Sequence, residues 1–211
     1  MRSLISALIF LAATAHAVAA EPGYYKVTGV AAGDVLNIRL APDPSSDVIG
    51  DYPPDASPVE VLEVVNSAGG EWGRVIASDS DGWVAMKFLA PTQVTHIDGT
   101  ELPSGLHCSG TEPFWDGVLT TNNLSFSAID VAEYSLPLGV AVTTLGRQYR
   151  YALVAENEQE RMTAIVAQDF ECSDGMSDRH FRWRIDMLRE NGKDGDFPAA
   201  YEGCCRLPLG Q

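Results

Sequence analysis

Short runs in which apolar and polar residues alternate, each ended by turn-forming residues, constrain the fold of this chain more than any other feature. Alternation with a period of two places successive side chains on opposite sides of an extended strand. It is strictest in 182–188, where Trp183, Ile185 and Met187 are expected to face inward and the charged residues between them outward. Helical periodicity is absent from the second half, apart from a single turn expected near 177–180. The chain is therefore predicted to be all-β.

The predicted strands fall into two groups, which we interpret as two domains. About five short strands within residues 24–90 indicate a small, partly open barrel. About seven or eight strands within 107–211 indicate an antiparallel barrel or sandwich. Residues 91–106, with Pro91 and Pro103, are predicted to form a short ordered linker. The predicted strands are 35–40, 48–50, 59–65, 72–75, 82–85, 115–120, 124–127, 140–143, 148–154, 161–167, 182–188 and 201–205.

All four cysteines lie in the second group of strands: Cys108, Cys172, Cys204 and Cys205. An even number of cysteines in an exported chain indicates two disulfides. A bond between the adjacent Cys204 and Cys205 would strain the intervening peptide, so we discount it. Two pairings remain open, and each joins Cys108 and Cys172 to the C-terminal pair. The alternative, a zinc site, would need Cys-x-x-Cys or nearby histidine spacing, and neither occurs.

Residues 1–20 have the layout of a secretory signal peptide. Arg2 precedes a short apolar run, 4–13, and small residues follow, with a cleavage box at 17–19 or 18–20. The alternative is an uncleaved membrane anchor, although a spanning helix needs about 20 apolar residues. No later stretch meets that requirement. The predicted organisation is a signal peptide, 1–20, a first domain, 21–90, the linker, 91–106, and a disulfide-stabilised domain, 107–211, in a periplasmic or secreted protein.

The charge of the chain excludes some classes of partner. Its formal net charge is -15, from 29 acidic and 14 basic side chains, and it contains no long basic run. Nucleic-acid binding needs a dense face of lysine and arginine to neutralise phosphates, so it is not expected. Docking on an anionic membrane surface is disfavoured for the same reason.

The first domain resembles the bacterial SH3-like domain over about residues 24–90. The residues that carry this resemblance are 36–39 followed by Ala41-Pro42, then Gly50, 71–75, 82–84 and Phe88-Leu89. The resemblance implies a barrel of antiparallel strands. It also implies a role in cell-wall targeting or peptide binding, with peptidoglycan, a peptide or an envelope protein as the partner.

Five residues of this domain are candidate ligand contacts: Asn37, Arg39, Tyr52, Trp72 and Trp83. An arginine fork can bind a carboxylate, and tryptophan offers a large apolar surface. Tyr24 and Tyr25 would add aromatic surface. The structural alternatives are core packing for the tryptophans, a local carboxylate for Arg39 and backbone capping for Asn37. The acidic loop 78–81 is expected to disfavour an acidic ligand.

The second domain resembles a family of bacterial envelope proteins with no established activity. The resemblance spans most of residues 106–206 and rests on three elements: 108–115 (CSGTEPFW), 172–179 (CSDGMSDR) and 203–205 (GCC). The Tyr-Pro pair that usually follows the second element is replaced here by His180-Phe181-Arg182. The resemblance therefore implies a location in the envelope, and it implies no reaction.

A second candidate site combines residues of these elements: Glu112, Trp115, Asp174, Ser177, Asp178 and Arg179. Converging carboxylates can serve acid–base or glycosidic chemistry. The alternative, which we favour, is that Glu112 caps backbone donors and that Asp174, Ser177 and Asp178 organise a turn. A Ser177–His180 nucleophile and base is a weaker hypothesis, because no nucleophile elbow is present.

No metal or cofactor is predicted. His96, His107 and His180 lack zinc-ligand spacing, and Asp194 and Asp196 lie in an incomplete calcium pattern that favours a solvated hairpin end. The hypothesis is therefore an exported, non-enzymatic envelope protein whose first domain binds a cell-wall peptide or a protein segment. The alternative is an envelope hydrolase or hydrolase inhibitor that uses the carboxylates of the second domain.

Overall fold

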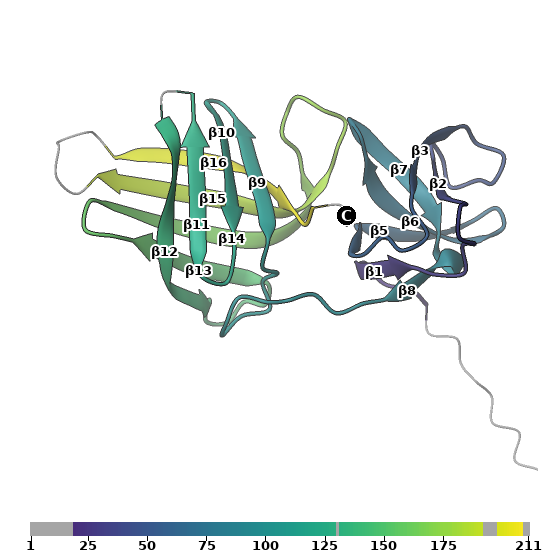
Figure 1. Cartoon of the computed structure of the whole chain (residues 1–211), viewed down its shortest axis with the longest axis horizontal. Helices are drawn as coiled ribbons and strands as arrows, with labels where there is room; N and C mark the ends of the chain where they lie inside the picture. Colours follow the sequence, from purple (N-terminus) through teal and green to yellow (C-terminus); the bar gives the residue numbers. More distant parts are fainter. Residues whose placement is uncertain (1–18, 130, 192–197, 209–211) are drawn as a thin grey trace, which may run out of the picture.

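The computed structural model describes residues 19–129, 131–191 and 198–208, and it shows two all-β domains side by side (Figure 1). The expected signal peptide lies almost entirely outside the described residues, as do Asp194 and Asp196. Within the described part, the single helical segment is a 3-10 turn, η1, at Met86–Phe88. The helical turn expected near 177–180 is absent; that segment is a loop, for a reason given below.

The N-terminal domain consists of two small antiparallel sheets. One has the order β4-β1-β8 and the other the order β3-β2-β7-β6-β5. Its core lies between the sheets, because alternate residues such as Leu36, Ile38, Val75 and Val84 turn inward from their strands. The strands are β1 (Gly23–Val27), β2 (Leu36–Arg39), β3 (Val48–Tyr52), β4 (Val59–Val61), β5 (Glu63–Ser67), β6 (Gly70–Ala77), β7 (Ser80–Ala85) and β8 (Leu89–Pro91).

The long strand predicted at 59–65 is wrong in one respect, because it is two strands. Its first part, β4, pairs with β1, and its second part, β5, pairs with β6 in the other sheet. Leu62 lies at the break, where its N–H donates to the Arg74 carbonyl and its side chain is buried. An alternating pattern predicts extended backbone and does not show where the chain changes sheets.

The C-terminal domain is a closed eight-stranded antiparallel barrel, which decides between the two predicted alternatives of barrel and sandwich. Its order is β10-β11-β12-β13-β14-β15-β16-β9. Trp183, Ile185 and Met187 face the interior as predicted, and large buried side chains fill it. The strands are β9 (Leu106–Thr111), β10 (Phe114–Leu119), β11 (Asn123–Ala128), β12 (Val131–Thr143), β13 (Arg150–Glu156), β14 (Glu160–Cys172), β15 (Phe181–Asn191) and β16 (Ala199–Arg206).

The two disulfides join Cys108 to Cys205 and Cys172 to Cys204. Neighbouring residues of a strand point to opposite faces, so the adjacent cysteines of β16 serve different sides of the barrel wall. Cys205 belongs to the interior cluster and bonds its direct cross-strand partner on β9. Cys204 lies on the outer side, in a buried cluster with Leu62 of the other domain. One disulfide therefore reinforces barrel closure, and the other fixes the end of β14 at the domain boundary.

The segment between the domains is ordered and packs against the barrel. Ile97 and Leu102 are fully buried in the barrel core, and the Ile97 N–H donates to the Leu102 carbonyl at 2.9 Å. This segment runs from β8 to β9 along one side of both domains in Figure 1. It therefore does more than connect the domains, because it contributes apolar side chains to the core of the second one.

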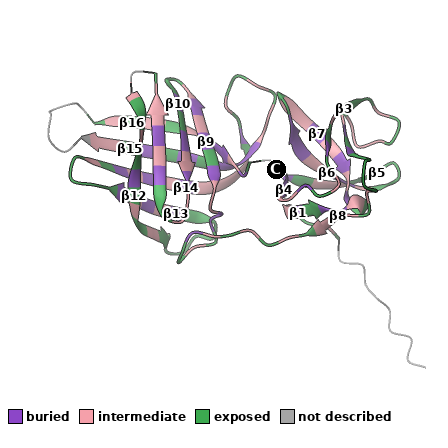
Figure 2. Ribbon diagram, in the orientation of Figure 1, coloured by how far each residue is buried: buried purple, intermediate pink, exposed green. Residues whose placement is uncertain are grey.

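A loop of the barrel domain holds the two domains together. The loop after β14 rises between the domains toward β7 in Figure 1. Asp178 of this loop forms a parallel bridge with Ser80, and the Asp178 N–H donates to the Asp79 carbonyl at 3.2 Å. Purple, buried stretches occur in both domains in Figure 2. A third buried cluster spans the boundary and contains Leu62, Ile76, Cys172, Phe181 and Cys204.

Candidate functional site

Four of the five predicted ligand residues lie on one face of the five-stranded sheet of the N-terminal domain. Asn37 and Arg39 alternate with core residues on β2, so they share its outer face. Arg39 is the direct cross-strand partner of Trp83 on β7. Trp72 pairs with Ala85 on the neighbouring strands β6 and β7. The sheet order β3-β2-β7-β6-β5 thus assembles these residues across three adjacent strands.

A groove of ≈ 500 Å³ lies at one end of this face. Val35 and Phe88 supply apolar walls, and Val35 is 41% exposed although it is a large apolar side chain. Lys87 lines the groove too, with its Nζ atom 5.0 Å from the centre of the Phe88 ring. The other lining residues are Gly29, Val30, Ala31, Asp34, Leu36, Asn37, Arg39, Pro44, Gly69, Trp72 and Ala85.

Arg39 and Asn37 differ in how firmly they are held. Arg39 donates from Nη1 to the Ser46 carbonyl at 2.7 Å. The predicted local role of Arg39 is therefore filled by a carbonyl oxygen and not by a carboxylate. Asn37 is exposed and lies opposite Asp51 on β3. Arg39 is therefore held in place by the backbone, whereas the Asn37 side chain can contact solvent or a ligand.

The predicted aromatic contacts need correction. Tyr52 faces the domain core, where it is buried and its hydroxyl donates to the Ile76 carbonyl at 3.4 Å, so it is not a ligand residue. Trp72 is 4% exposed, and its indole N–H donates to the Ala68 carbonyl, so it contributes only an edge to the groove. Trp83 is half-buried beside the groove and does not line it. Tyr25 is buried in the core of the N-terminal domain, Tyr24 is half-buried against the barrel core, and neither lines the groove.

The acidic loop 78–81 lies at the domain boundary and not at the groove. Asp81 accepts hydrogen bonds from Arg74 Nη1 at 3.1 Å and from the His180 N–H at 3.0 Å, and its Oδ2 lies 2.8 Å from His180 Nδ1. The loop is thus used to attach the barrel domain. The expectation that this loop disfavours an acidic ligand stays a prediction, and the loop does not line the groove.

The second predicted cluster organises the boundary loop. The Asp174 carboxylate accepts hydrogen bonds from the Met176 N–H, from the Ser177 N–H and hydroxyl, and from Arg179 at 3.0 Å. Partial burial raises the pKa of Asp174, but these hydrogen bonds outweigh burial and lower the pKa below its ordinary value. Because they hold Met176, Ser177 and Arg179 around one carboxylate, the segment forms a loop in place of the expected helical turn.

The remaining residues of that cluster do not form a catalytic group. Trp115 is inside the barrel, where its indole N–H donates to the Glu202 carbonyl at 2.9 Å, so it is not a site residue. Glu112 and Asp178 are exposed. The Ser177 hydroxyl bonds to Asp174, while His180 bonds to Asp81, so the two do not act together. Among the described residues there is no group of metal-ligating side chains, and no helix is long and apolar enough to cross a membrane.

A buried carboxylate at the domain boundary escaped the sequence analysis. Glu60 of β4 is buried, and the Tyr24 hydroxyl and the Leu207 N–H face it, although within the described residues neither of its oxygens makes a hydrogen bond of ordinary length and angle. Burial raises the pKa of Glu60 to about 7, although the charges of Arg182 and Arg206 oppose this shift. Arg182 of β15 is buried as well, over the ring of Tyr24. Because side chains alternate along a strand, those of Glu60 and Arg182 point away from the core of their own domain. The contact between the domains then buries both.

Val35, Lys87 and Phe88 line the groove and were not predicted as candidate site residues. Phe88 belongs to the last element of the SH3-like resemblance, and its position there was the one available signal. Val35 belongs to the strand predicted at 35–40, and in the structure it lies just before β2. Sequence patterns do not separate an apolar residue in a core from one beside a groove, because both alternate with polar neighbours.

Comparison with known protein families supports the assignment of the first domain. Residues 34–90 match the bacterial SH3 domain family. The match begins just before β2, while β1, which completes the three-stranded sheet, precedes it. No curated protein and no solved structure matches the chain. The N-terminal domain is therefore SH3-like, and the resemblance of the barrel domain to an envelope family stays a prediction.

Proposed function

We propose that the groove of the N-terminal domain binds an extended segment with a free carboxylate, supplied by a cell-wall peptide or by an envelope protein. The observation that carries this proposal is the combination of Arg39 and Lys87 with the apolar surfaces of Val35 and Phe88 in one preformed groove. Two cations beside one acid, Asp34, favour a carboxylate, which suits a guanidinium fork. Apolar walls with a few polar groups are typical of binding sites.

The family match supports a binding role for this domain, since bacterial SH3 domains often have functions related to the cell wall. The groove is the location that we propose for that role. The groove lies on the N-terminal domain, away from the loop that attaches the barrel, so a ligand would not compete with the contact between the domains.

The proposal places the protein outside the cytosol and assigns it no reaction. Two disulfides within one domain are typical of oxidising compartments such as the periplasm or the exterior. In the barrel domain, Asp174 is held by hydrogen bonds that favour its ionised form, so it is a poor general acid. The signal peptide, export and the absence of catalysis are parts of this proposal.

Retention on purified peptidoglycan sacculi tests the ligand class. The protein without residues 1–20 should sediment with sacculi, and Val35→Asp should lower retention at least about five-fold, because it places a carboxylate in the groove. Val48→Asp is the matched control, since Val48 is 51% exposed on β3 and does not line the groove. Equal loss in both variants, or none in either, would contradict the groove assignment.

A second arm separates the two sources of the ligand. If the unchanged protein does not sediment with sacculi, the cell-wall source is wrong. Peptides with a free C-terminal carboxylate and their C-terminal amides then test the protein source. Binding of the carboxylate form alone, weakened by Arg39→Gln, would support it.

A further inference from the structure

The three sequence elements of the barrel domain converge on one surface hollow of ≈ 410 Å³, which is separate from the groove of the N-terminal domain. The β9–β10 turn, the loop after β14 and the end of β16 surround it. Its lining residues include Glu112, Phe114, Asp174, Met176, Arg184 and Glu202.

Folding accounts for several of these residues. A Cβ atom on Gly203 would lie 2.1 Å from the Ser109 carbonyl oxygen, and one on Gly110 would lie 2.2 Å from the Glu202 carbonyl oxygen. Both glycines thus allow the close approach of β9 and β16 beside the Trp115 ring. The Cys172–Cys204 disulfide and the hydrogen bonds to Asp174 then fix the wall of the hollow. The hollow is therefore preformed.

Folding does not account for Phe114, Met176 and Glu112. Phe114 is 49% exposed at the start of β10, and Met176 is 67% exposed near the tip of the loop. Single exposed apolar residues are common, but here two large ones line the same hollow. Glu112 is exposed beside them. An apolar surface and a carboxylate presented together indicate a ligand with matching parts.

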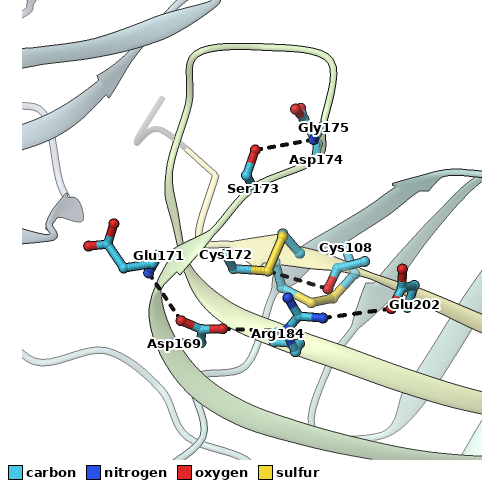
Figure 3. Close-up of a disulfide and its surroundings, with 12 residues drawn as sticks. Cys108, Asp169, Glu171, Cys172, Ser173, Asp174, Gly175, Arg184 and Glu202 are labelled. Carbon is cyan, nitrogen blue, oxygen red and sulfur yellow. Dashed lines mark hydrogen bonds and ion pairs between the residues drawn. A yellow bond between two sulfur atoms is a disulfide. The ribbon is translucent and has the colours of Figure 1, made fainter.

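The charges around the hollow are mostly negative. Its lining includes the carboxylates of Glu112, Asp174 and Glu202 and one cation, Arg184. Figure 3 shows Arg184 between two acids, with its Nε 3.3 Å from Asp169 and its Nη1 3.7 Å from Glu202. The charge of Arg184 is thus already shared, and that of Asp174 is matched by Arg179 at 3.0 Å. Negative charge remains at Glu112, which forms no ion pair among the described residues, and in part at Glu202. An anionic ligand is disfavoured here and a cationic one is favoured.

We propose that this hollow binds an alkylammonium group, such as a lysine side chain. Its aliphatic stem would lie against Phe114 and Met176, and its ammonium group would face Glu112 and Glu202. The Phe114 ring adds attraction for a cation, and long cationic side chains commonly place their stems on apolar surface while the charge stays in water. A flexible stem with a compact charge fits a hollow that is apolar at one rim and acidic at the other.

Amide NMR titrations of the protein without residues 1–20 test this proposal at constant ionic strength. The probes are n-butylammonium, the neutral 1-butanol, the anionic butyrate, and the blocked peptide acetyl-Gly-Lys-Gly-amide. The two cationic probes should shift the amide signals of 110–114 and 172–176 in a saturable way. Saturation by butylammonium at least as tight as by the peptide would show that the amine alone suffices. Tighter binding of the peptide would identify a lysine-bearing segment as the source.

Substitutions locate the effect at the hollow. Phe114→Ala and Glu112→Gln should each weaken butylammonium binding about three-fold or more. Leu145→Ala and Glu158→Gln are matched controls, because both residues are exposed elsewhere on the barrel. Retained dispersion of the amide spectrum shows that each variant is folded. The proposal is wrong if butanol or butyrate shifts the same signals as strongly, if no probe shifts them, or if both hollow variants bind as the unchanged protein does.

Discussion

Replacing Glu60 by glutamine should remove a large part of the dependence of stability on pH. The pKa of Glu60 rises from an ordinary value of 4.5 to about 7 in the folded protein. The folded state therefore binds a proton that the unfolded state releases between these two pH values. Stability from this group is fully present below pH 4.5 and is lost as the pH rises toward 7.

The size of this effect follows from the shift. Each pKa unit corresponds to about 1.4 kcal/mol, so the free energy of unfolding should fall by about 3 kcal/mol across this interval. The groups that face Glu60 set the shift and are kept in the variant. They are Tyr24 of β1, Tyr52 of β3, Arg182 of β15 and Arg206 of β16. The pKa of both tyrosines is raised by burial, so they stay neutral throughout this interval.

Urea unfolding at several pH values between 4.5 and 8 measures the effect, because the difference between the two proteins isolates Glu60 from the other carboxylates. The stability of Glu60→Gln relative to the unchanged protein should rise by about 3 kcal/mol over this range. A constant offset from the amide group does not alter that slope. Glu158→Gln, in an exposed turn, should show no such trend. A difference that stays constant within about 0.5 kcal/mol would refute the conclusion that burial raises the pKa of Glu60.

Three further predictions concern the barrel and its loop. Gly203→Ala should destabilise the protein by about 3 kcal/mol or more in urea unfolding, because its Cβ atom would collide with the Ser109 carbonyl oxygen. Gly139→Ala is the control and should be tolerated, since its Cβ atom would meet only an ordinary contact at 3.8 Å. Similar losses in the two variants would show that close approach at Gly203 is not what makes this position sensitive. Asp174→Asn should cost about 1 to 3 kcal/mol at pH 7. Because the pKa of Asp174 is lowered in the folded protein, the loss should diminish as the pH falls through that lowered pKa, and a loss independent of pH would be inconsistent with the shift. Replacing Cys172 and Cys204 together by serine should lower the free energy of unfolding by about 2 to 4 kcal/mol and speed amide hydrogen exchange in the loop between β14 and β15. Unchanged exchange would show that the disulfide does not hold this loop.

The candidate groove was only partly predictable. Alternation on β2 correctly placed Asn37 and Arg39 on one side of the strand, opposite Leu36 and Ile38. Alternation did not show whether Tyr52 faces the groove or the core, because a tyrosine ring is found in both environments. In the structure Tyr52 lies in the core, where its hydroxyl donates to the Ile76 carbonyl. An aromatic residue near a family motif can therefore be assigned to a ligand site only when the order of the strands in the sheet is known.

Local patterns in the sequence determine that this chain forms strands, which residues alternate along them, and that Cys204 and Cys205 serve opposite faces of one strand. These properties depend on neighbours in the chain, so they can be read before folding is known. The pairing of the cysteines was decided by barrel closure, which places Cys108 on the inner side of β9 beside Cys205. The burial of Glu60 was decided by the contact between the domains, because residues distant in the sequence cover a side chain that its own strand leaves outside.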